Sequence, residues 1–200
     1  MKRLPKLFPL ALTRRREPFD HPDWIFELKH DGFRGVAYIA DATCRIISRR
    51  DNVFKSFKPL RDTLGRLRVK DAILDGEIIC MNEEGVSIFN QLLFRRGVQY
   101  FYAFDLVWLN GRDLRGLPLL KRKERLKKLI IKANNPQLLY ADHVDQYGVD
   151  FFRMICDKNL EGIVAKHRDS CYDTRAKWIK IKNPAYTQSE RRHELFETFK

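Results

Sequence analysis

The chain is 200 residues long, which is enough for one domain with a full hydrophobic core and too short for two ordinary domains. Hydrophobic residues make up 44% of it and charged residues 32%, as in soluble globular proteins, and no apolar run approaches the roughly 20 residues that a membrane span requires. We therefore expect a cytoplasmic protein with no membrane association. The net charge of +13 favours a polyanionic partner, although charge alone does not separate a DNA-binding surface from a well-solvated basic protein.

Residues 1–19 are predicted to be a basic N-terminal arm. They do not resemble a secretory signal, because Pro5, Pro9 and the arginines at 14–16 interrupt the apolar run that such a signal requires. Beyond the arm, short runs rich in β-branched and aromatic residues, bounded by turn signals, predict strands at 24–28, 33–40, 44–48, 72–80, 99–109, 137–141, 162–166 and 178–183. Apolar residues at three- and four-residue spacings predict helices at 87–95, 119–132 and 149–158.

The last segment, residues 187–200, opens with Thr187 and Glu190 in the spacing of a capping box and is predicted to be a closing helix. Strands that mainly follow strands, with helices inserted irregularly, indicate an α+β domain with antiparallel sheets flanked by helices. The four cysteines have no metal-ligand spacing and are predicted to be reduced core residues: Cys44, Cys80, Cys156 and Cys171.

The stretch "IFELKHDGFRG" raises the question of chemistry, because a strand-like run ends there in Lys29. One interpretation is a plain hairpin turn at Asp31-Gly32 with flanking charges. The other makes Lys29 a nucleophile, since lysine is one of the few side chains that form a covalent adduct with an activated electrophile. A free lysine has a pKa of about 10.4, so only about one in 2500 is unprotonated at pH 7 and the residue needs help.

Nearby cations could supply that help, because a cation at roughly 5 Å disfavours the protonated form by about 3 kcal/mol at an effective dielectric near 20. Arg34 is close in sequence, and the alternation of "WIKIK" places Lys180 and Lys182 on one face of a strand. The same three cations would bind a phosphate chain, which suggests a nucleoside triphosphate as the target.

Two apolar strand-like runs carry carboxylates, with Asp75 and Glu77 in "ILDGEIIC" and Glu161 in "NLEGIVAK". An acidic residue in or beside a buried strand is costly unless a cation or hydrogen bonds compensate it. Metal binding by Glu77 and Glu161 is therefore expected, with Mg2+ as the ion, while a strand-end carboxylate without a ligand is the simpler alternative.

The order of these pieces resembles the ATP-dependent DNA ligase family. "KHDGFR" fits its nucleotidyltransferase lysine signature, and "SRR", "DGEII", "FYAFDLVWLNG", "EGIVAK" and "WIKIK" resemble its later motifs in the same order, over roughly residues 20–184. The resemblance is closest to the adenylation domain of bacterial enzymes. It implies a single nucleotidyltransferase (ATP-grasp-like) domain over residues 1–200, with ATP and Mg2+ as cofactors and nicked duplex DNA or DNA ends as the partner.

Residue by residue, the resemblance implies that Lys29 attacks the α-phosphate of ATP to give a lysyl-AMP. It implies that Glu27 helps to read the adenine and that Phe104 stacks on it. The ribose, phosphates and metal would be held by Arg34, Arg49, Glu77, Glu161, Lys180 and Lys182. Lys166 matches the end of "EGIVAK", with at most a minor direct role.

Enzymes of this family normally continue into an oligonucleotide-binding (OB) barrel, and only about 18 residues follow "WIKIK". The resemblance therefore leaves two main interpretations: an enzyme that seals nicks in DNA repair, with a separate DNA-binding or OB-fold protein as a possible partner, or a reduced relative that binds ATP or nucleic acid as an accessory module. An RNA ligase or a capping-type nucleotidyltransferase is a further alternative, because the lysine motif is shared.

Overall fold

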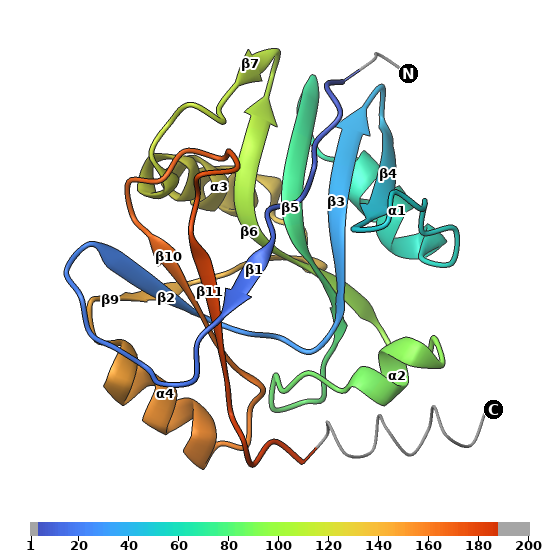
Figure 1. Ribbon diagram of the computed structural model, residues 1–200. Helices are drawn as coiled ribbons and strands as arrows, with labels where there is room; N and C mark the ends of the chain where they lie inside the picture. The colour runs from blue at the N-terminus through green and yellow to red at the C-terminus, as the bar shows by residue number, and fades with distance from the viewer. Residues whose placement is uncertain (1–3, 188–200) are drawn as a thin grey trace.

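The computed structural model describes residues 4–187, which form two sheets packed against each other (Figure 1). The first sheet has the strand order β1-β11-β10-β2-β9, with bounds Leu12–Arg14, Trp178–Lys182, Gly162–His167, Trp24–Leu28 and His143–Asp145. The second has the order β4-β3-β5-β6-β7, with β8 beside β6, and bounds Thr43–Ser48, Phe33–Ala40, Asp71–Cys80, Gln99–Leu109, Arg112–Asp113 and, for β8, Leu138–Tyr140.

The helices cover the outer faces of the two sheets: α1 (Lys58–Gly65) and α3 (Leu119–Ala133) lie on the second sheet, and α4 (Gly148–Asp157) lies on the first, while the short α2 (Phe89–Leu93) follows β5 (Figure 1). One apolar cluster lies between the second sheet and its helices, another between α4 and the first sheet, and a third between the two sheets. Apolar side chains fill only part of the space between the two sheets. The rest of this space contains the charged groups described below.

The predicted α+β class is confirmed, and each strand or helix predicted before residue 187 overlaps an observed element. Most strand pairs are antiparallel as expected, but β1 pairs with β11 and β6 pairs with β8 in parallel. The prediction missed β1, β7, β9 and α1. These strands have two or three residues, too few to show an alternating pattern, and α1 has only Leu60 and Leu64 as large buried apolar residues.

The segment after Lys29 is a crossover between sheets and not a hairpin, so the turn interpretation of Asp31-Gly32 is wrong. β2 ends at Leu28 in the first sheet and β3 begins at Phe33 in the second. Gly32 is required for space, since a Cβ there would lie 2.3 Å from the carbonyl oxygen of Ile78 in β5. The nucleophile candidate thus lies where the chain passes from one sheet to the other.

The central strand β5 explains how carboxylates come to be buried. Leu74 and Ile78 point into the cluster beneath α1 and α3, and by the period of two the intervening residues Ile73, Asp75 and Glu77 face the first sheet. The strand is therefore apolar on its helix side and partly charged on its sheet side.

The predicted N-terminal arm is packed onto the domain over its described part, since Leu7 and Leu10 are 8% exposed and the Leu7 amide donates to Tyr38 at 2.8 Å. The predicted closing helix lies outside the described residues beyond Thr187. The four cysteines are free, but only Cys44 and Cys80 are buried; the prediction was wrong for the other two, which are partly exposed. Within residues 4–187, no helix is both long and apolar enough to cross a membrane.

The burial of α3 generates the first prediction. Leu126 is fully buried, and Leu126→Ala is expected to lower the free energy of unfolding by about 2–5 kcal/mol, because it removes apolar contacts and leaves a cavity. Ile131 lies on the same helix but is 71% exposed, so Ile131→Ala should change stability by no more than about 0.5 kcal/mol. Urea denaturation of the three proteins checks this, and equal losses for both variants would contradict the packing of α3.

Candidate active site

Lys29 lies at the junction of two adjoining cavities between the sheets. Its backbone amide continues the pairing of β2 with β10 by donating to Gly162 at 2.9 Å, which fixes the position of the side chain. The Nζ atom forms an ion pair of 2.7 Å with Glu161 Oε2, and the side chain is 18% exposed. Residues predicted from distant parts of the sequence thus meet at one point.

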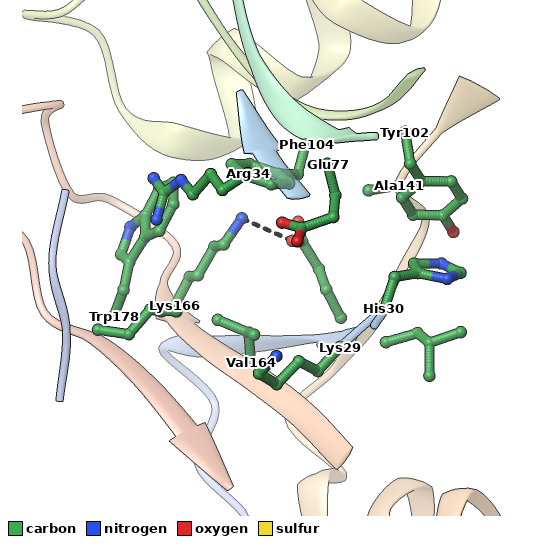
Figure 2. A pocket seen from close by; sticks show the side chains of 13 residues that line it. Lys29, His30, Arg34, Glu77, Tyr102, Phe104, Ala141, Val164, Lys166 and Trp178 are labelled. Atoms are coloured by element: carbon green, nitrogen blue, oxygen red, sulfur yellow. Dashed lines mark ion pairs between the residues drawn. The ribbon is translucent and has the colours of Figure 1, made fainter. Parts of the chain in front are cut away.

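The first cavity, here called the base pocket, is lined by apolar and aromatic side chains with a few charges, as is usual for small-molecule sites. Phe104 and Trp178 meet edge-to-face in its wall at 5.6 Å. Figure 2 shows this pocket with Lys29 and His30 on one side and Phe104, Tyr102 and Glu77 on another. Of the predicted residues, the pocket is lined by Glu27, Lys29, Arg34, Glu77 and Phe104.

Glu27 is the buried carboxylate of the base pocket, with 2% exposure. Lys123 Nζ lies 2.5 Å from one carboxylate oxygen, and Lys166 Nζ lies 2.6 Å from the other, an ion pair drawn dashed in Figure 2. Burial acts to raise the pKa of Glu27, but the charges of Lys123 and then Lys166 outweigh it and hold that pKa below its ordinary value. Glu27 is therefore an anion that accepts hydrogen bonds.

Lys166 has a further kind of neighbour, because its Nζ lies 3.9 Å from the ring centre of Trp178 and 4.3 Å from that of Phe104. Burial lowers the pKa of Lys166 to about 8, against the opposing charge of Glu27, with Lys123 lowering it further. Its ammonium is shared between a carboxylate and two aromatic faces, an arrangement that places positive charge at the pocket wall.

The second cavity, here called the cationic cavity, opens on the other side of Lys29. The predicted residues that line it are Lys29, Arg34, Arg49, Glu77, Glu161, Lys180 and Lys182. Burial lowers the pKa of Lys180, and nearby cations lower it further, in the order Lys182, Lys29, Arg49 and Arg14. Several positive charges therefore crowd together, which is the arrangement that binds a phosphate chain.

The cations expected to activate Lys29 have carboxylate partners of their own. Arg34 donates to both oxygens of Asp75, at 3.1 and 2.7 Å, and Lys182 lies 3.1 Å from Glu161. The three cations predicted around Lys29 line one cavity with it, but for two of them a carboxylate offsets part of the charge that would act on the amine. Lys29 itself must leave its ion pair with Glu161 before it can attack an electrophile.

The two carboxylates predicted to bind metal line the cationic cavity together, but they differ in their surroundings. Glu161 has Lys29 and Lys182 as partners. Burial raises the pKa of Glu77 to about 7, because the repulsion of Glu161 and Asp75 adds to desolvation and the opposing charges of Lys29 and Arg34 do not overcome it.

Whether these carboxylates can bind Mg2+ depends on which other ligands the ion would have. Among the described residues no group of three or more histidine, cysteine or acidic side chains could hold a metal ion. Mg2+ bound by one or two carboxylates with substrate phosphates needs no such group, and the raised pKa of Glu77 indicates a carboxylate short of positive charge. The residues present thus fit a metal that arrives with a phosphate chain.

Several residues of the site were missed by the sequence prediction. Asp75 was noted only as a strand carboxylate, yet it binds both Arg34 and the hydroxyl of Tyr172, at 2.6 Å. Trp178 carried no signal, because the pattern around it is that of an ordinary core strand. Lys123 did carry one, since it lies four residues after Leu119 and three before Leu126 on the apolar stripe of α3. A buried acid such as Asp75, which requires a cationic partner somewhere, was the second available clue.

The fold is that of a nucleotidyltransferase domain. A family model described as "ATP dependent DNA ligase domain" matches residues 11–182, and the chain belongs to this family.

The chain matches two relatives over different shares of their own length. It is 30% identical over 192 residues to the SPbeta prophage-derived DNA ligase-like protein LigB of Bacillus subtilis, covering 90% of this chain and 68% of LigB. It is 32% identical over 168 residues to the multifunctional non-homologous end joining protein LigD of Pseudomonas aeruginosa, covering 80% of this chain but only 20% of LigD.

A solved structure of mycobacterial DNA ligase D complexed with ATP and MES superposes with a TM-score of 0.76 and 29% identity, over 88% of this chain and 60% of that one. The predicted nucleotidyltransferase fold is thereby confirmed.

The buried pair of Asp75 and Arg34 generates the second prediction. Asp75→Asn leaves the largely buried Arg34 charge uncompensated and should lower the free energy of unfolding by about 3–5 kcal/mol. Asp113→Asn is the matched control, because it breaks an ion pair with Arg115 whose side chains are 42% and 41% exposed, and it should cost no more than about 1 kcal/mol. Chemical denaturation measures both, and equal effects would contradict the role of Asp75.

Proposed function

We propose that this domain transfers AMP from ATP through a covalent bond to Lys29 and passes it on to the 5′-phosphate of DNA. The observation that carries the proposal is the position of Lys29, where the base pocket meets the cationic cavity. A nucleotide with its base in the first and its phosphates in the second would place the α-phosphorus beside Nζ. DNA is the expected partner, because the full-length relatives of this family are ATP-dependent DNA ligases.

In the first step, the ammonium of Lys29 loses one proton to solvent and Nζ attacks the α-phosphorus, so that a P–N bond forms, the bond to pyrophosphate breaks and the nitrogen releases a second proton to solvent. Phosphoryl transfer of this kind needs positioning and neutralisation of charge more than acid-base catalysis. Glu161 would hold Nζ in place until the phosphate arrives, and Arg49, Lys180 and Lys182 would neutralise the charge on the departing pyrophosphate. When bound, Mg2+ would add positive charge on the phosphate oxygens, with Glu77 and Glu161 as its protein ligands.

Because both transfers are in-line displacements at the same phosphorus, the cationic cavity would bind pyrophosphate in the first step and the DNA phosphate in the second. Pyrophosphate must leave on the side of the phosphorus opposite Nζ. In the second step, an oxygen of the DNA 5′-phosphate attacks the same phosphorus and Nζ is the leaving group, taking up a proton, so the DNA phosphate must enter from that same side. The cations that neutralise pyrophosphate would thus later hold the DNA end. Attack by a 3′-hydroxyl on the adenylated DNA would then expel AMP and seal the strand.

In the base pocket, Phe104 would stack on the adenine and Glu27 would accept a hydrogen bond from its amino group. The carboxylate of Glu77 would bind ribose hydroxyls, and Arg34, fixed by Asp75, would approach the ribose or the phosphates.

A cytoplasmic location and a separate OB-fold partner remain predictions. So do the alternatives of an accessory module and of an RNA ligase or capping-type enzyme.

The third prediction tests the covalent step. Incubation with α-labelled ATP and Mg2+ should label the protein through an acid-labile, base-stable bond, as expected of a phosphoramidate, and Lys29→Ala should abolish the label. Lys29→Arg keeps a cation opposite Glu161 but provides no transferable amine, so it should be unlabelled as well. Lys128→Ala, at an exposed position of α3, is the control and should be labelled like the wild type. A wild type without label would overturn the proposal.

The fourth prediction concerns the acceptor. With a duplex carrying one nick and a labelled 5′-phosphate, the wild type with ATP and Mg2+ should produce adenylated DNA, and sealed product if the third step is completed. Product lengths on a denaturing gel distinguish the two. A protein that forms lysyl-AMP but modifies neither a DNA nick nor a DNA end, and instead acts on a nicked RNA strand, would favour the RNA ligase alternative.

A further inference from the structure

We propose that Lys123, a residue of helix α3 outside the cavities, is a specificity-determining positioning residue that makes the domain select adenine over guanine nucleotides by fixing the carboxylate of Glu27. The inference rests on the proposed function in that a nucleotide base occupies the base pocket with Glu27 at the position of the adenine amino group.

The carboxylate of Glu27 forms ion pairs with lysines from two elements that are distant in the sequence. Lys123 Nζ reaches one oxygen from α3 at 2.5 Å, and Lys166 Nζ reaches the other from β10 at 2.6 Å. The two oxygens are therefore fixed, and their remaining lone pairs are available to a ligand in the pocket. A carboxylate held in this way accepts hydrogen bonds and donates none.

An acceptor at this place distinguishes the two purines. Adenine presents an amino group at its position 6, which donates, whereas guanine presents a carbonyl oxygen there, which accepts and would be repelled by an anion. The wrong purine is disfavoured because two acceptors, the carboxylate of Glu27 and the guanine carbonyl, would then face each other with no proton between them, and the carbonyl would lose its hydrogen bond to water. The selection depends on Glu27 staying anionic and in place.

The two lysines that pair with Glu27 differ in whether they line the base pocket. Lys166 lines the base pocket, lies against Phe104 and Trp178, and has a pKa lowered to about 8 by burial. Within the described part of the chain, Lys123 lines neither the base pocket nor the cationic cavity, and its side chain is 1% exposed. Lys123 thus acts on the nucleotide only through Glu27.

The position of Lys123 is itself held on several sides. Its Nζ donates to the carbonyl oxygen of Ala141 at 2.7 Å and lies 4.7 Å from the ring centre of Tyr140. The preceding residue, Arg122, is also fully buried and forms a two-point ion pair with Asp105 in β6, at 2.8 and 2.9 Å. Helix α3 therefore turns two consecutive cations inward, and one of them, Lys123, reaches the carboxylate of Glu27.

The fifth prediction uses Lys123→Met, with Lys121→Met as the matched control on the exposed side of the same helix. ATP and GTP binding are measured separately by calorimetry in the presence of a chelator, so that no transfer occurs. In Lys123→Met the preference for ATP over GTP should fall by about tenfold or more, since Glu27 loses the cation that fixes one oxygen. Lys121→Met should keep the wild-type preference.

A double-mutant cycle separates positioning from a general structural effect. In a Glu27→Gln background, Lys123→Met should cause no further change in the ATP to GTP ratio, because its route to the nucleotide is already removed. Lys123→Arg keeps the cation and should retain most of the preference, and it serves also if Lys123→Met does not fold. With labelled nucleotides and Mg2+, Lys123→Met should raise KM for ATP with little change in kcat.

Three results would overturn the inference: an unchanged ATP to GTP binding ratio in folded Lys123→Met, a loss of preference in Lys123→Arg as large as that in Lys123→Met, or a wild type without base preference. Failure of the proposed function gives a different result. A wild type that binds ATP better than GTP but never becomes labelled would remove the covalent chemistry and leave the role of Lys123 standing.

Discussion

The carboxylate of Glu27 lies between the two sheets, where an unpaired charge would cost several kcal/mol. Lys123 from α3 and Lys166 from the neighbouring strand β10 offset that cost only at short range, so the pairing with Lys123 holds α3 against the strands β2 and β10, which are already hydrogen-bonded to each other. Asp75 and Arg34 do the same within the second sheet. The base pocket is therefore shaped by charges that must stay paired as much as by apolar packing.

The ion pairs of the site fall into two groups with different exposure. Those around Glu27 and Asp75 are almost completely buried, and breaking them would leave an isolated charge in the interior. The pairs of Glu161 lie at the cationic cavity, with the Lys29 side chain 18% exposed and that of Lys182 41% exposed. In the proposed function these lysines would exchange the carboxylate for a phosphate, and Glu161, whose side chain is only 4% exposed, would then need another positive partner such as the metal ion. The interior pairs thus keep the frame rigid while the outer pairs can rearrange on binding.

Much of this arrangement could be predicted from the sequence, and the limits have physical causes. Lys29 and Glu77 stand in short motifs beside recognisable strands, so their type and neighbours identified them. Lys123 lies on the apolar stripe of α3, four residues after Leu119 and three before Leu126, so the helical spacing alone indicates that it turns inward. Lys121 and Lys127 do not lie between two buried leucines in this way, and they are exposed. The spacing does not contain the partner of Lys123, because the carboxylate of Glu27 is 96 positions away in the sequence.

Glu77 shows why an incompletely satisfied charge belongs in such a site. No hydrogen bond or ion pair to its carboxylate occurs within the described residues, and burial raises its pKa to about 7, so near neutral pH it takes up a proton readily. Ribose hydroxyls or a metal ion would supply the missing partners and favour the charged form. The desolvation that burdens the free protein would then be offset when ligand binds. A carboxylate already satisfied, as Asp75 is by Arg34 and Tyr172, has no such free energy to contribute to binding.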